Sequence, residues 1–300
     1  MIARGLAGAR PATAPRGWGW GSISTVVFTD LDGTLLDEVT FSCSAALPVL
    51  RALEAAGIPV VPVTSKTGAE VRHLRSSLAL GGPYVVENGA AAFLPLEGGG
   101  ERRVVWSPGR PHLSSFLDRH RREFDLRCFS DMSVSEVAAR TGLAPEAARR
   151  AKLREYTEPF LLGAGNRLAE LEERAREEGL RIEAGGLFLH LSAPHDKGSA
   201  VRWLLEELEG QGSAVRSIGL GDSPNDLSLL RSVDVPITIP RPDGQHLPWR
   251  FDRAVHRAPF PGSRGWSAAV QEALGLEIER ISHRSAASCS PTQQEGSSDV

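Results

Sequence analysis

Short apolar runs of strand length alternate along this chain with stretches of helical period. The apolar runs cover residues 25–29, 59–63, 84–86, 215–220 and 235–239. Helical patterns separate them at 45–56, 68–80, 198–208 and 225–230. Strands that are apolar on both faces belong to parallel sheets with helices on each side. The alternation therefore predicts an α/β fold built on a parallel sheet.

The middle of the chain has a different pattern. We expect charged helices at 111–124, 134–139, 145–152 and 166–178, and strands at 181–183 and 187–191. This predicts an inserted α+β domain over residues 108–189, between two parts of the core at 23–107 and 190–282. An insertion between strands of a parallel sheet lies over their carboxyl ends, where α/β proteins bind ligands.

The two ends of the chain differ in composition from the rest. Residues 1–22 hold three arginines and no acid, which favours a disordered leader or an over-long translation start; a transit peptide is the alternative. The tail, 283–300, is rich in serine, and we expect it to be disordered.

Composition narrows the function classes. A chain of 300 residues that is 41% hydrophobic can bury a large core, and its formal net charge of −3 gives no sign of a nucleic-acid surface. No apolar run reaches the roughly 20 residues of a membrane span, and three scattered cysteines make no disulfide scaffold. We expect a cytoplasmic protein that acts on a small molecule, without nucleic-acid or membrane partners; the sequence leaves its oligomeric state open.

Two carboxylates follow the first predicted strand, Asp30 and Asp32, and Gly33 comes directly after them. Close like charges at the carboxyl edge of a sheet need a cation, and oxygen ligands favour a hard ion such as Mg²⁺. A strand-ending turn that is merely rich in Asp and Gly is the alternative.

A second oxygen-rich loop follows the strand at 215–220. Its sequence, GLGDSPND, places Asp222, Asn225 and Asp226 within five residues. These side chains form a second set of oxygen ligands; a capped helix that begins at a proline is the alternative.

Hydroxyl and lysine side chains complete the pattern. Thr64, Ser65 and Lys66 follow the second predicted strand, where a hydroxyl can bind a phosphoryl oxygen or simply cap the next helix. Lys197 opens a helix, a position that is unfavourable for a cation unless it faces an anion. Only three of the 34 basic residues are lysines, and these are two of them.

These four segments, in their order along the chain, resemble the haloacid dehalogenase superfamily. The position of the insertion resembles its sugar-phosphatase branch. Several stretches are similar to the mannosyl-3-phosphoglycerate phosphatase family: VFTDLDGTLL (27–36), TSKT (64–67), ENG (87–89), REYTEPF (154–160), HDKG (195–198) and GLGDSPND (219–226). The resemblance implies a Rossmann-like parallel-sheet core with an inserted α+β cap, and a phosphatase that hydrolyses mannosyl-3-phosphoglycerate.

The resemblance also implies catalytic roles. Asp30 would attack phosphorus and form an aspartyl-phosphate, while Asp32 would protonate the leaving oxygen and then activate water. Thr64 would hold a phosphoryl oxygen, and Lys197 would offset the charge of the transferring group.

A magnesium ion is implied as well. Asp30, the backbone carbonyl of Asp32 and Asp222 would bind it. Asn225 and Asp226 would act through water or orient the catalytic lysine.

The cap would recognise the leaving group. Arg154 is the candidate for the glycerate carboxylate, because a guanidinium forks onto a carboxylate, and Glu158 is the candidate for sugar hydroxyls. Ser65 and Lys66 could reach the glycerate or the phosphate, and Asn88 is expected to face the cleft. Surface charge on a polar insertion is the alternative for the cap residues.

Other functions stay open at this stage. The same chemistry fits glucosyl-3-phosphoglycerate, sucrose phosphate or a general sugar phosphate, and a phosphomutase of the superfamily shares the motifs. A catalytically silent binding protein is the non-enzymatic alternative, against which the complete motifs count.

Overall fold

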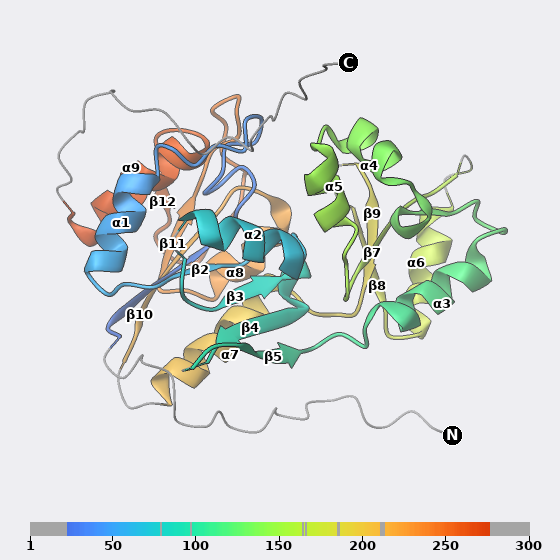
Figure 1. Ribbon diagram of the computed structural model, residues 1–300, viewed down its shortest axis with the longest axis horizontal. Helices are drawn as coiled ribbons and strands as arrows, with labels where there is room; N and C mark the ends of the chain where they lie inside the picture. The colour runs from blue at the N-terminus through green and yellow to red at the C-terminus, as the bar shows by residue number, and fades with distance from the viewer. Residues whose placement is uncertain are drawn as a thin grey trace, which may run out of the picture.

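The computed structural model describes residues 23–276, except 79, 97, 164, 166, 185–186 and 211–213. The predicted leader (1–22) and tail (283–300) lie outside these residues. Figure 1 shows a core beside a smaller part of the chain. We call the smaller part the inserted unit and define it as the elements from α3 (Arg110–His120) to β9 (Leu189–Ser192).

The core is built on a parallel sheet. Five strands follow the order β12-β11-β10-β1-β2, and all neighbouring pairs are parallel. They are β1 (Thr25–Thr29), β2 (Val60–Pro62), β10 (Arg216–Gly221), β11 (Val235–Thr238) and β12 (His256–Arg257). Val27 of β1 lies in one hydrophobic cluster, and Val26 and Phe28 lie in another. Burial on both faces explains the apolar strands and confirms the predicted α/β core.

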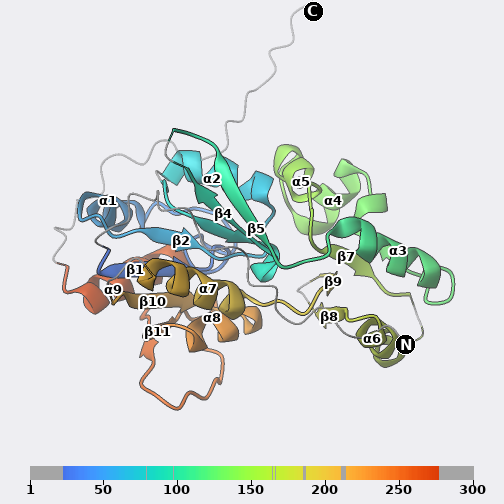
Figure 2. The same ribbon diagram turned by 90° about the horizontal axis from the view of Figure 1, so that it is seen from below.

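Helices contribute side chains to both hydrophobic clusters. The Val27 cluster includes residues of α1 (Leu47–Ala55), α2 (Gly68–Leu78) and α9 (Gly262–Leu274). The Phe28 cluster includes residues of α7 (Lys197–Glu209) and α8 (Leu227–Arg231), which lie beside β10 in Figure 2. None of the described helices is long and apolar enough to cross a membrane.

Beyond β2, three antiparallel strands continue the core. They are β3 (Tyr84–Val86), β4 (Ala91–Pro95) and β5 (Glu101–Val105), and Val63 pairs in parallel with Val85. The sequence predicted β3 but neither β4 nor β5. A short 3₁₀ turn, η1 (Glu87–Gly89), joins β3 to β4, and its three residues have φ of 48°, 60° and 95°.

The inserted unit has its own antiparallel sheet, in the order β6-β7-β9-β8. The new strands are β6 (Arg127–Cys128), β7 (Glu158–Leu161) and β8 (Arg181–Ala184), and sequence analysis missed the first two. Helices α3 and α6 (Leu168–Glu177) pack on Phe160 and Leu191, while α4 (Val134–Thr141) and α5 (Pro145–Ala151) pack around Phe129. The predicted boundary at residue 190 falls inside β9, because β9 pairs with β8 as far as Ser192. The division into domains stays a prediction.

Candidate active site

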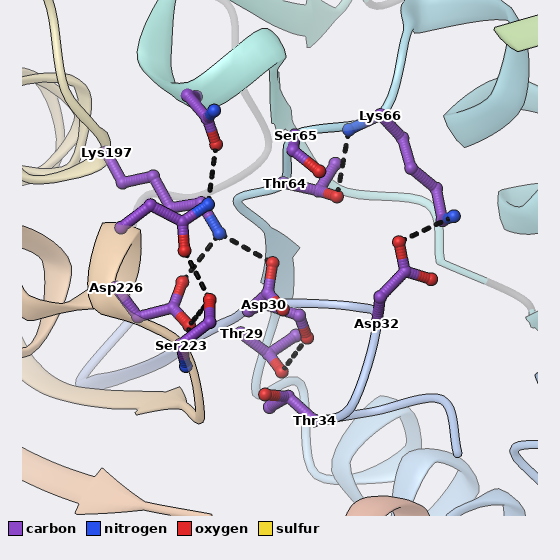
Figure 3. A network of polar contacts seen from close by, with 12 residues as sticks. Thr29, Asp30, Asp32, Thr34, Thr64, Ser65, Lys66, Lys197, Ser223 and Asp226 are labelled. Carbon is purple, nitrogen blue, oxygen red and sulfur yellow. Dashed lines mark hydrogen bonds and ion pairs between the residues drawn. The ribbon is translucent and has the colours of Figure 1, made fainter. Parts of the chain in front are cut away.

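Polar side chains from four segments meet at one edge of the core sheet. Asp30 follows β1, Thr64 lies beyond β2 and Lys197 begins α7, as Figure 3 shows. Asp222 follows β10. Because β2, β1 and β10 are parallel neighbours, their carboxyl ends lie side by side. The structure thus brings together the four segments that the sequence singled out.

Lys197 is the central cation of this cluster. Its Nζ lies 2.6 Å from Oδ1 of Asp30 and 2.6 Å from Oδ1 of Asp226, and all three side chains are buried. Burial alone would lower the pKa of Lys197, but the charges of Asp226 and Asp30 raise it overall. Burial raises the pKa of Asp30 well above its usual value, against the opposing effect of Lys197. The lysine therefore holds Asp30 in place, and its two carboxylate partners favour its charged form.

Asp222 is fixed by the turn after β1. Thr34 Oγ1 donates to Asp222 Oδ1 at 2.6 Å. A Cβ at Gly33 would lie 2.6 Å from Asp222 Oδ2, and Gly33 has φ of +77°, so only glycine fits there. Burial and the charge of Asp226 raise the pKa of Asp222 to about 7, against the hydrogen bond from Thr34.

Three carboxylates in this cluster could hold a divalent cation. Asp30, Asp222 and Asp226 each offer an oxygen, and the three oxygens lie within 4.8 Å of one another. A buried group of oxygen donors with excess negative charge suits a hard ion. Asp226 accepts a hydrogen bond from Lys197 and also belongs to this group.

The side chain of Asp32 lies outside that group. Its Oδ2 pairs with Lys66 Nζ at 2.8 Å, and its Oδ1 is buried without a hydrogen-bond partner among the described residues. Burial opposes protonation of Lys66, yet the charges of Asp32 and Glu70 raise its pKa. Figure 3 shows this pair opposite Lys197, across Asp30.

The predicted hydroxyl and amide residues lie around the same edge. Thr64 is buried, and its Oγ1 accepts a hydrogen bond from the backbone N–H of Lys66 at 3.2 Å. Ser65 is half-buried. Asn225 Nδ2 donates to Asn88 Oδ1 at 3.0 Å, so the turn after β3 touches the loop after β10.

Two residues expected to contact the substrate have partners inside the protein. Glu158 is buried in the inserted unit, where it accepts from Ser130 N at 2.8 Å and pairs with Arg110 at 3.0 Å. Both carboxylate oxygens are thus engaged within the inserted unit, and a contact of Glu158 with a sugar stays a prediction. Arg154 donates Nε to Thr157 Oγ1 and one Nη to Ser65 O, both at 2.8 Å. Its Nε and one Nη are engaged by other parts of the protein, and its contact with a glycerate carboxylate stays a prediction.

Sequence analysis gave no role to Glu87, the first residue of the turn after β3. It is fully buried, and it accepts from the backbone N–H groups of residues 155, 156 and 157 and from Thr157 Oγ1. A buried acid has to be paired, but its partners lie 68 to 70 positions away in sequence, so no local pattern identifies them.

A cavity of about 340 Å³ adjoins the cluster. Arg181 and Glu183 of β8 line it from the inserted unit, and Asn88, Lys197 and Asn225 line it from the core. Its size suits a small ligand, and its walls carry both charges. The sequence did not single out Arg181.

Comparison with known proteins gives the same assignment as the geometry. Residues 27–98 match the family described as haloacid dehalogenase-like hydrolase. Two relatives carry the name glucosyl-3-phosphoglycerate/mannosyl-3-phosphoglycerate phosphatase. The one from Persephonella marina is 38% identical over 85% of this chain and 98% of its own length. The one from Methanococcoides burtonii is 35% identical over 83% of this chain and 97% of its own length.

The fold also matches solved structures. A Thermoplasma acidophilum protein superposes with a TM-score of 0.61 at 17% identity, over 85% of this chain and all of its own. Likeness at that identity shows the fold alone, whereas the two relatives match at 38% and 35% identity over nearly their whole length. The chain therefore belongs to the haloacid dehalogenase-like hydrolases, and within them to the phosphatases.

Proposed function

We propose that this protein hydrolyses mannosyl-3-phosphoglycerate to mannosylglycerate and phosphate. The observation that carries the proposal is the 38% identity, over nearly its full length, to a relative whose name gives glucosyl- and mannosyl-3-phosphoglycerate as substrates. The buried cluster of Asp30, Lys197 and Asp222 supports the phosphatase chemistry. Glucosyl-3-phosphoglycerate is the alternative, since the two sugars differ in one hydroxyl's orientation.

The reaction would run in two steps. A carboxylate oxygen of Asp30 attacks phosphorus, the bond from phosphorus to the glycerate oxygen breaks, and an aspartyl-phosphate forms. Asp32 gives a proton to the leaving oxygen. It then takes a proton from a water molecule that attacks phosphorus, which releases phosphate and restores Asp30. Oδ1 of Asp32, which is buried and has no hydrogen-bond partner in the part of the chain that the structure describes, is an atom able to carry that proton.

The surrounding residues would stabilise charge. Lys197 donates a hydrogen bond to Asp30 and would offset the negative charge that builds up on the phosphoryl group. Thr64 has its hydroxyl at the neighbouring strand end and is placed to bind a phosphoryl oxygen. Loss of one such donor typically costs about 10²–10³ in turnover.

We further propose Mg²⁺ as the cofactor. Asp30, Asp222 and the backbone carbonyl of Asp32 would hold it, with Asp226 beside them and Asn225 acting through water. When bound, the ion supplies a positive charge that polarises the phosphoryl oxygens. The carboxylate group described above fits such an ion.

Side-by-side assays test the substrate. Phosphate release would be measured with mannosyl-3-phosphoglycerate, glucosyl-3-phosphoglycerate and sucrose phosphate, each with Mg²⁺ and again with a chelator. We expect release that depends on Mg²⁺ and the highest kcat/KM with the mannosyl compound. Equal kcat/KM for sucrose phosphate would refute the proposed substrate class.

The nucleophile has a matched control. Asp30→Asn is expected to lower turnover by at least about 10³-fold, because the amide cannot form the acyl-phosphate. Asp243→Asn, at an exposed position, should leave turnover unchanged. Full activity of Asp30→Asn would remove Asp30 as the nucleophile.

A further inference from the structure

The carboxylate of Glu87 joins the core to the inserted unit. Its Oε1 accepts from Glu155 N at 2.8 Å, and its Oε2 accepts from Tyr156 N, Thr157 N and Thr157 Oγ1 at 3.2, 2.8 and 2.7 Å. These donors lie in the short irregular segment, residues 155–157, that leads into β7. Because Glu87 is fully buried, water cannot replace the bonds, so each is worth more than at the surface.

Arg154 adds a second connection at the same place. It donates to Ser65 O at 2.8 Å, and its Nε lies 3.6 Å from Glu87 Oε2. The guanidinium therefore neutralises the buried carboxylate. It also ties the inserted unit to the loop that holds Thr64.

The turn that carries Glu87 contacts the other catalytic segments. Glu87 N donates to Lys66 O at 3.0 Å, and Asn88 N donates to Thr64 O at 2.9 Å. Asn88 also accepts from Asn225, as described above. A Cβ on Gly89 would lie 2.1 Å from the carbonyl oxygen of the residue before Lys197. The turn thus packs against the loops after β2 and β10 and against the start of α7.

We propose that Glu87, with Arg154 and Thr157, is a positioning group that sets the inserted unit against the phosphate-binding loops. This inference rests on the proposed function, in which the inserted unit recognises the leaving group. Binding energy from a large leaving group lowers the barrier at the phosphate only if the inserted unit and the phosphate-binding loops are held in a fixed relative position. A small phosphate ester does not contact the inserted unit and does not depend on that position. Glu87 and its two partners therefore determine the turnover of large substrates specifically.

Two variants test the proposal. Glu87→Gln keeps the shape but turns an NH₂ toward backbone N–H donors, and Thr157→Val removes only the hydroxyl between Glu87 and Arg154. Glu155→Gln is the matched control, because it breaks another ion pair between the core and the inserted unit. In that pair Glu155 lies 2.6 Å from Arg103, and both side chains are over 40% exposed. Such an exposed pair contributes little.

The measurements are kcat and KM with the glycosyl-3-phosphoglycerate and with p-nitrophenyl phosphate, together with thermal unfolding. For Glu87→Gln we expect kcat/KM for the large substrate to fall by about 10- to 100-fold, as for a misplaced catalytic group. The value for p-nitrophenyl phosphate should stay within about threefold. Thr157→Val should show a smaller change in the same direction, and Glu155→Gln none.

A purely structural role predicts other results. If both substrates lose activity equally, or neither does, the proposal is wrong. Should Glu87→Gln fail to fold, the same comparison with Thr157→Val decides.

Hydrogen exchange separates this inference from the proposed substrate. The amides of residues 155–157 should exchange faster in Glu87→Gln than in Glu155→Gln, whatever the substrate is; unchanged exchange overturns the inference. If the wild type hydrolyses p-nitrophenyl phosphate but neither glycosyl-3-phosphoglycerate, the proposed function fails instead. The kinetic comparison then uses the best sugar phosphate found.

Discussion

Lys66 Nζ lies 2.8 Å from Asp32 Oδ2, so the proposed acid–base residue is paired with one of the three lysines of the chain. The Lys66 side chain is only 12% exposed, and the ring of Phe41 lies 5.7 Å from its Nζ. The pair leaves one oxygen of Asp32 for the reaction. Lys66 thus orients Asp32 in addition to any contact with substrate.

This pairing predicts the effect of changing Lys66. Lys66→Met should lower kcat by about tenfold or more, because a free Asp32 side chain no longer keeps one geometry for proton transfer. Lys66→Arg keeps the charge and should retain more activity than Lys66→Met. Steady-state kinetics on the three proteins checks this; wild-type kcat in Lys66→Met would show that the pair has no catalytic effect.

Lys197 is predicted to matter for stability as well as for activity. Lys197→Met leaves Asp30 and Asp226 without their buried cation, and breaking such a network typically costs about 3–5 kcal/mol. Urea unfolding in a chelator measures the loss without help from a metal ion. Adding Asp226→Asn to Lys197→Met should recover part of the stability but no activity. If the free energy of unfolding of Lys197→Met equals that of the wild type, the cluster contributes nothing net to the fold.

Gly89 offers a comparison in which backbone strain is matched. Gly89 and Gly98 have φ of +95° and +90°, so alanine is strained at both. At Gly89 a Cβ would lie 2.1 Å from Asp196 O, whereas at Gly98 no atom of the described residues lies within 4 Å of it. Gly89→Ala should therefore destabilise the protein more than Gly98→Ala and lower kcat, because α7 must move with Lys197. Equal loss of stability in the two variants would mean that strain alone explains Gly89.

The core and its catalytic edge could be predicted because their determinants are local. An apolar strand such as β1 followed by Asp30 and Asp32 is visible in five to ten residues, and parallel pairing then brings successive strand ends together. Three of the strands that were missed lack such a pattern. β7 contains Pro159, which argues against a strand, and β6 and β12 have two residues each.

Contacts between distant segments explain why the internal partners of the expected substrate residues could not be predicted. Arg154 and Glu158 have the chemistry that a sugar-glycerate needs, but their partners are Ser65 and Arg110, 89 and 48 positions away. A sequence does not show which partner a charged side chain will find. The same limit hid the contacts of Glu87.

The dependence of stability on pH can be predicted from two histidines, His195, which is buried, and His190, which is half-buried. His195 is 5% exposed, and both its ring nitrogens lack hydrogen-bond partners within the described part of the chain. Burial and the charge of Arg181 lower its pKa to about 4, and burial and Arg154 lower the pKa of His190 to about 3.

Folding therefore favours the neutral form of both histidines. The unfolded chain takes up their protons near pH 6.5, and the folded chain does so only at lower pH. Their contribution to the free energy of unfolding is complete above pH 6.5 and falls by about 1.4 kcal/mol per pH unit for each histidine as the pH drops toward 4. Denaturant unfolding between pH 4.5 and 7.5 should show a shallower slope for His195→Gln than for the wild type. His112→Gln, at an exposed position on α3, should keep the wild-type slope. A slope that is the same in all three proteins would mean that His195 is not held neutral in the fold.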